Sequence, residues 1–365
     1  MTELSKEQII NKVRGSMIGG AVGDALGYQI EFDRGVKPKQ VTRFGDNHGI
    51  ISDDTQMTLF TACGLLWRKT RHHLRGIAIS PAEAIYYAYL DWLGTQQRVS
   101  EHNSVSWIKD IPELNVLRAP GMTCLSALSS GVRGTLEEPI NDSKGCGGVM
   151  RIAPIALCTD EDNIGRISAE SCAITHGHPL AILSAYVLGL IIHYAFIDYS
   201  ITDAVKTAIE KMNDWVSKID DDRYLDEEEY LIDLLNEAIE LAKTDIEDQV
   251  AIRKLGEGWV AEESVAIAVY CAAKYEDDFE SAIVAAANHD GDSDSTAAIA
   301  GNIIGAKLGY DKIPDYYKDN IELKDVILQL SDDLANAVPV DQNDNPPDEW
   351  LDKYVHVKKN SKTSS

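Results

Sequence analysis

The sequence predicts an all-α fold: one compact domain built from many helices. Along nearly all of the 365 residues, apolar side chains recur three and four positions apart, which is the spacing of one helix face. Strand signals are few, because only residues 41–44 and 50–51 could pair briefly at an edge and no strand–helix–strand alternation occurs. Hydrophobic residues form 44% of the chain, which is ample material for one large core.

The helices can be predicted in chain order. The first, over residues 10–21, combines one apolar face with several glycines, which would let another backbone approach closely. Ser80 and Pro81 are a cap and a first helical residue, so a helix should run from there to about residue 94. Further helices are expected at residues 123–130, 162–175, 180–196, 202–216, 226–242, 261–274, 280–287, 295–307 and 322–337.

No linker divides the first 310 residues. We expect residues 1–310 to form one helical domain with an acidic insertion around 214–248. Residues 311–356 should extend the same domain, and the polar residues 357–365 should form a disordered tail.

Charge and composition limit the class of protein. A formal charge of −25 argues against binding to nucleic-acid backbones or anionic membranes, because both require a positive field. Residues 179–196 approach the length of a membrane span, but Ser184, Gly189 and His193 and the lack of a basic flank favour a buried helix. The six cysteines lack CxxC spacing and the N-terminus lacks the apolar run of a signal peptide, so we expect a cytoplasmic location.

Two clusters of acids and hydroxyls are candidates for a metal site. They are SDDT at residues 52–55 and HDGDSDST at residues 289–296. Either cluster alone is explained by a helix cap with acids in the first turn. Their combination, with Asp24 and Glu31 at the end of the glycine-rich helix, indicates oxygen ligands for a hard divalent cation.

Two other known metal-binding motifs resemble parts of the sequence, but neither fits its surroundings. Residues 292–296 match the DxDxT motif of haloacid-dehalogenase-type phosphotransferases, but that motif should follow a buried strand near the start of an α/β domain. Asp221, Asp222 and Asp226 loosely resemble the magnesium motif of terpenoid synthases, but their strongly acidic surroundings indicate a solvated loop.

A glycine-rich stretch, GCGGVMR at residues 145–151, precedes an apolar helix. Such a loop can aim backbone N–H groups at a phosphate, although a tight turn explains the glycines equally well. His176 lies between two helices, where a histidine more often caps or packs than catalyses, so we place it behind the residues that contact a ligand.

Seven motifs in order resemble the ADP-ribosylglycohydrolase family. They cover residues 13–309 and are GSMIGGAVGDALG (15–27) with Glu31, SDDTQM (52–57), YLDWLGTQ (89–96), GCGGVMRIAP (145–154), THGHP (175–179), GEGWVAEES (256–264) and GDSDSTAAIAGNIIGA (291–306). The resemblance implies a helical domain of that family's type that holds two divalent cations, Mg²⁺ or Mn²⁺.

The resemblance also implies roles for individual residues. The metal ligands would be Ser52, Asp53, Asp54, Asp292, Asp294 and Ser295. The catalytic residues would be Asp53, Asp292 and Glu31, the last on a mobile loop over the site. Substrate would be bound by Gly147, Gly148, Val149, Met150 and His176, and Asp24 would support the metal end. Many relatives have Asn in place of Cys146 and Thr in place of Ser52 and Ser295.

The activity that the resemblance implies is removal of ADP-ribose from a modified protein side chain, with arginine as the expected acceptor, by cleavage of the glycosidic bond at the distal ribose. Two alternatives stay open. The acidic surface and the long C-terminal part also suit a binding protein that neutralises an ADP-ribosyltransferase toxin by occlusion. The same site could instead hydrolyse free ADP-ribose derivatives such as O-acetyl-ADP-ribose.

Overall fold

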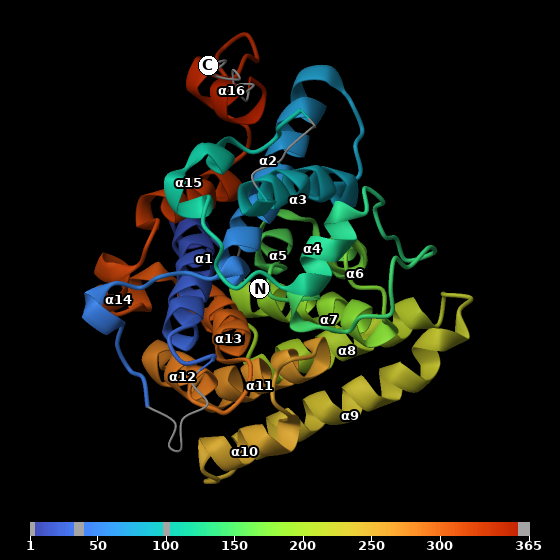
Figure 1. Cartoon of the computed structure of the whole chain (residues 1–365), viewed down its shortest axis with the longest axis vertical. Helices are drawn as coiled ribbons and strands as arrows, with labels where there is room; N and C mark the ends of the chain where they lie inside the picture. Colours follow the sequence, from blue (N-terminus) through green and yellow to red (C-terminus); the bar gives the residue numbers. More distant parts are fainter. Residues whose placement is uncertain (1–3, 33–39, 98–102, 357–365) are drawn as a thin grey trace.

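Two helices packed backbone against backbone form the centre of the fold, α1 (Lys6–Gly27) and α13 (Ser293–Leu308) (Figure 1). The structure is a computed structural model that describes residues 4–32, 40–97 and 103–356. These residues form sixteen α-helices and no strand, so the predicted all-α class is confirmed.

Glycines make the contact between α1 and α13 possible. A Cβ atom on Gly15, Gly19, Gly23 or Gly27 would lie 2.0–2.4 Å from a backbone oxygen of α13, so no side chain fits at these positions. Gly15 faces Gly305 and Gly27 faces Ser293, which makes the two helices antiparallel. The end of α1 therefore lies against the start of α13.

The helix α2 (Asp53–Arg75) also begins at the end of α1. The Asp24 carboxylate of α1 accepts the N–H of Ser52 at 3.0 Å and the N–H of Thr55 at 3.1 Å, and it accepts a further bond from the Thr55 hydroxyl at 2.5 Å. Asp24 thus adds a second cap to α2 beyond the Ser52 side chain. This agrees with the expected supporting role of Asp24.

The other helices enclose this centre. They are α3 (Pro81–Gln97), α4 (Met122–Ser129), α5 (Ala153–Cys158), α6 (Glu161–Ala173), α7 (Pro179–Phe196), α8 (Ile201–Val216), α9 (Leu225–Ala242), α10 (Asp248–Leu255), α11 (Ala261–Lys274), α12 (Phe279–Ala287), α14 (Asp315–Asn320), α15 (Lys324–Ala335) and α16 (Asp348–Tyr354). Each predicted helix is present, and most ends agree within about three residues. The exception is α1, which was predicted over residues 10–21 and is longer at both ends.

Helix α7 is long and apolar enough to cross a membrane by length and composition, but 89% of it is buried among its neighbours. Its apolar character is therefore explained by packing, as predicted. The acidic α9 lies with α10 at one edge of the molecule (Figure 1).

The predicted edge pairing of residues 41–44 with 50–51 is wrong. The Val41 N–H instead donates to Asn288 Oδ1 at 2.7 Å, and the Val41 carbonyl accepts a hydrogen bond from Asn288 Nδ2 at 2.8 Å. Gly49 forms an isolated bridge with Ile321, because the C-terminal segment lies beside it. The tail expected at 357–365 falls outside the described residues.

Candidate active site

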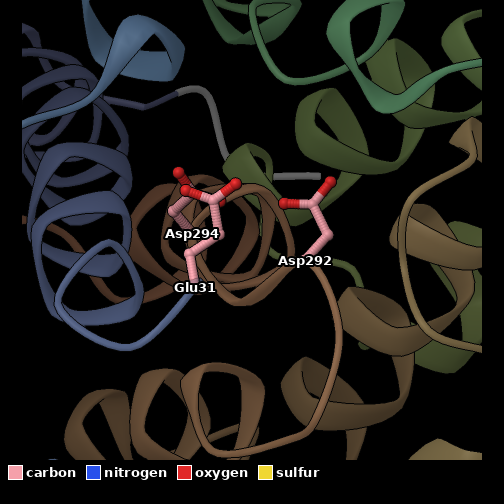
Figure 2. Close-up of side chains that lie close together, drawn as sticks. All are labelled: Glu31, Asp292 and Asp294. Atoms are coloured by element: carbon pink, nitrogen blue, oxygen red, sulfur yellow. The ribbon is translucent and has the colours of Figure 1, made fainter. Parts of the chain in front are cut away.

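Three carboxylates converge where α1 ends and α13 begins. Glu31 follows α1, Asp292 caps α13, and Asp294 stands in its first turn. Figure 2 shows the three side chains directed into the same space, and an oxygen from each lies within 4.8 Å of the others. The antiparallel contact of α1 with α13 is what brings these distant residues together.

The cluster lines a cavity of about 210 Å³ that also contains the start of α2. Its polar wall comprises Glu31, Asp53, Asp54, Asp292, Asp294 and Ser295. The rest comes from residues within 119–124, the glycine-rich loop, His176 and Trp259. The two acid clusters of the sequence, separated by more than two hundred residues, thus share one cavity.

Several carboxylate oxygens in the cavity lack protein partners. Glu31 Oε2, Asp54 Oδ1 and Asp292 Oδ2 are buried and accept no hydrogen bond from the described residues. Buried unpaired carboxylates are costly, and several such oxygens in one place are the ligand set of a hard divalent cation. The residues present therefore fit a metal ion.

Burial controls the protonation of the cluster when no cation is bound. It raises the pKa of Glu31 to about 10, with further contributions from the charges of Asp294 and Asp292. Burial also raises the pKa of Asp53, Asp54 and Asp292 well above the usual range. The cluster therefore retains protons that a bound cation would displace.

The predicted ligands differ in what they already bond. Asp53 Oδ2 accepts the N–H of Gly121 at 3.1 Å, which fixes one of its oxygens. The Ser52 hydroxyl accepts the Asp54 N–H at 3.2 Å as the cap of α2, and Ser52 is fully buried behind the cavity wall. Its role as a metal ligand stays a prediction.

The glycine-rich loop is a tight turn. The N–H groups of Gly148, Val149 and Met150 donate to backbone carbonyls of Gly145 and Cys146. These three N–H groups are therefore used inside the turn, and a phosphate contact by residues 147–150 stays a prediction. Gly147 and Met150 line the cavity, whereas Gly148 packs against Cys172, where a Cβ would lie 2.5 Å from the sulfur.

His176 lies directly beneath this turn and lines the cavity. Its Nδ1 shares a hydrogen with the Thr175 hydroxyl at 2.8 Å, and that hydroxyl accepts from Arg151 at 2.6 Å. Burial, with the nearby Arg151 charge, lowers the pKa of His176 to about 3. His176 is therefore neutral and suited to a hydrogen bond, not to carrying charge.

Sequence reasoning gave no role to several cavity residues. Trp259 and Cys146 stand in recognised motifs, and burial beside Asp292 and Asp54 raises the pKa of the Cys146 thiol well above its usual range. Residues 119–122 precede the predicted helix at 123–130 and carry no motif. They reach the cavity through tertiary bonds, such as that from the Gly121 N–H to Asp53 Oδ2 at 3.1 Å.

The profile of the ADP-ribosylglycohydrolase family matches residues 5–344. The chain belongs to the ADP-ribosylglycohydrolase family. It is 24% identical to the ADP-ribosyl-[dinitrogen reductase] glycohydrolase of Rhodospirillum rubrum, over 86% of this chain and 91% of that one. It is 23% identical to the ADP-ribosylarginine hydrolase Tri1 of Serratia proteamaculans, over 92% of this chain and 82% of that one.

The fold is also that of the family. A solved chain of an ADP-ribosylglycohydrolase-related protein complex superposes with a TM-score of 0.61 at 20% identity, over 90% of this chain and 98% of that one. Membership indicates a hydrolase of ADP-ribosyl groups. The family uses divalent metals, and the acidic cluster of this chain could hold one.

Proposed function

We propose that this ADP-ribosylglycohydrolase removes ADP-ribose from arginine side chains of modified proteins, with two divalent cations, Mg²⁺ or Mn²⁺, in the carboxylate-lined cavity. The observation that carries the proposal is the group of buried carboxylate oxygens without partners on Glu31, Asp54 and Asp292. The name of the Serratia relative supports arginine as the acceptor.

The proposed ligands come from two places in the chain. Asp53 and Asp54, with Ser52, lie at the start of α2, and Asp292, Asp294 and Ser295 lie at the start of α13. Glu31, just after the end of α1, lies beside them and is proposed as a catalytic residue. Bound here, the cations supply charge that holds ribose hydroxyls and lowers the pKa of a bound water.

The protein groups supply orientation and proton exchange. The Gly121 N–H holds one oxygen of Asp53, so its other oxygen faces a defined direction. Glu31 Oε2, which has no protein partner, is placed to exchange a proton with the leaving nitrogen or the attacking water. Neutral His176 offers a hydrogen bond to the substrate from beneath the turn.

The size of the cavity limits what it encloses. At about 210 Å³ it is smaller than the ~300–1,000 Å³ typical of pockets that enclose a whole small molecule. We therefore place the distal ribose in the cavity and the remainder of the ADP-ribose along the turn at 145–150 and Trp259.

The test is release of ADP-ribose from an arginine-ADP-ribosylated protein by the full chain with Mg²⁺ or Mn²⁺. Release should cease with EDTA and return with added metal. No release with either metal, under conditions in which the Rhodospirillum enzyme acts on its own substrate, would contradict the proposal. Release of ADP-ribose only from O-acetyl-ADP-ribose would assign the free derivatives as substrates instead.

A further inference from the structure

The side chain of Glu322, in the C-terminal segment, bonds to the residues that flank the proposed metal centre. This residue precedes α15 and is 8% exposed. It follows the last sequence motif of the family resemblance, so no motif draws attention to it. Its backbone N–H donates to the Gly49 carbonyl at 3.0 Å, and the Gly49 N–H donates to Asn320 at 2.8 Å. The residues that lead into α2 are therefore paired with the C-terminal segment.

The two carboxylate oxygens of Glu322 bond to two different segments. Oε2 accepts the N–H of Ile51 at 3.2 Å, just before the cap of α2. Oε1 accepts from Arg118 Nη2 at 3.2 Å, in the segment that forms part of the cavity wall. A single buried carboxylate thereby joins the chain before α2 to residues 118–121.

Residues 118–121 hold Asp53 directly, and Ile51 lies two residues before it in the chain. The Arg118 carbonyl accepts the Asp53 N–H at 3.0 Å, and the Gly121 N–H donates to Asp53 Oδ2 at 3.1 Å. Movement of residues 118–121 would therefore move both the backbone and the carboxylate of Asp53. Between these two bonds Ala119 has a φ of 53°, an unfavourable value for a residue with a side chain, which the surrounding bonds must maintain.

We propose that Glu322 is a positioning residue of the metal centre: by joining Ile51 to Arg118, it holds Asp53 in the orientation that binds the cation. The inference rests on the proposed metal site. Residues around metal ligands set their geometry and commonly change metal affinity by ~10–100-fold when substituted. The C-terminal segment is on this account part of the active site and not only a cover for the core.

Asp333 provides a matched control. It lies in the same C-terminal segment, is 7% exposed, and accepts bonds from Gln329 at 3.0 Å and Tyr354 at 2.6 Å. The Tyr354 bond joins α15 to α16, the Gln329 bond lies within α15, and neither involves a residue of the cavity wall. Asp333→Asn should therefore lower the melting temperature without changing metal binding.

The experiment is calorimetric titration of Mn²⁺ into the metal-free full chain, with melting temperatures recorded for each variant. Glu322→Ala should bind Mn²⁺ about tenfold more weakly than the wild type. Glu322→Gln should lose less affinity, because its amide oxygen can still accept one of the two bonds. Hydrolysis by Glu322→Ala should need correspondingly more Mn²⁺, while kcat at saturating Mn²⁺ is retained.

The outcomes separate the two proposals. Unchanged Mn²⁺ affinity in a folded Glu322→Ala protein would overturn the positioning role, as would an equal loss in Asp333→Asn. If Glu322→Ala does not fold, Glu322→Gln decides by the same comparison. A wild-type chain that binds no Mn²⁺ would refute the metal site itself, and this inference with it.

Discussion

Asp290 and Asp292 stand two residues apart in one loop and have opposite surroundings. Asp290 is exposed and pairs with Arg253 at 3.1 Å on the surface. Asp292 is buried in the cavity, and its Oδ2 has no protein partner. An exposed ion pair contributes little to the free energy of folding. A buried carboxylate without a partner is destabilising, and it persists where a bound ligand compensates for the lost hydration.

This contrast gives a prediction with an internal control. Asp292→Asn should lower both hydrolysis and Mn²⁺ affinity by about 100-fold or more, because it removes a charged oxygen from the proposed centre. Asp290→Asn should keep both within about twofold, since a surface pair is screened by water. Initial rates and Mn²⁺ titrations on the two variants check this, and equal behaviour of the pair would contradict the assignment.

At the scale of residues, the sequence identified the carboxylates of the cavity better than the residues that surround them. Asp53, Asp54, Asp292 and Asp294 could be found because acids with hydroxyls at helix starts form a local pattern. The contacts of residues 119–124 and of Glu322 could not, since they arise from bonds between segments far apart in sequence.

At the scale of elements, the pairing of α1 with α13 decides whether the site exists. The glycines of α1 predicted a close helix contact, but not which helix would make it. The partner depends on complementary small residues such as Gly301, whose own Cβ would lie 2.1 Å from the Gly19 oxygen. The start of α15 could not be predicted from the sequence either. The apolar spacing predicts a start at residue 322, but the helix begins at Lys324 because Leu323 has a left-handed φ of 58°.

We predict that Gly19→Ala destabilises the protein. In an isolated helix this change would be favourable by ~1 kcal/mol. Here the new Cβ would lie 2.4 Å from the Gly301 oxygen, and a backbone oxygen cannot rotate away as a side chain can. Overpacking costs about 1–3 kcal/mol, and a backbone clash lies at the upper end of that range, so the net free energy of unfolding should fall by ~2 kcal/mol.

Urea denaturation of Gly19→Ala measures the effect. The control is Lys206→Ala on the exposed face of α8, which should leave stability within about 0.5 kcal/mol. The separation of α1 from α13 should also weaken Mn²⁺ binding, because Glu31 and Asp294 approach each other across that contact. A Gly19→Ala protein as stable as the wild type would show that the contact adjusts without strain.

At the scale of the whole molecule, stability and metal binding are linked through protons. Burial, with the Asp294 charge, raises the pKa of Asp24 to about 7 from an ordinary value of 3.8, and burial raises that of Glu31 to about 10 from 4.5. The folded chain therefore binds more protons than the unfolded chain above about pH 4. The formal charge of −25 also destabilises the folded chain by repulsion, which grows as pH rises and more carboxyl groups ionise.

The metal-free protein should consequently become less stable as pH rises from about 5 to 8. The sign follows from the raised pKa of Asp24. Its stabilising contribution is fully present below the ordinary carboxyl pKa of 3.8, and it is lost as pH rises through the folded-state pKa of about 7. A divalent cation replaces those protons, so saturating Mn²⁺ should raise the melting temperature more at pH 8 than at pH 5. Melting curves with EDTA and with Mn²⁺ at both pH values measure this difference, and Asp292→Asn should reduce it. A Mn²⁺ effect that is equal at the two pH values would mean that the cation does not compete with protons in this cavity.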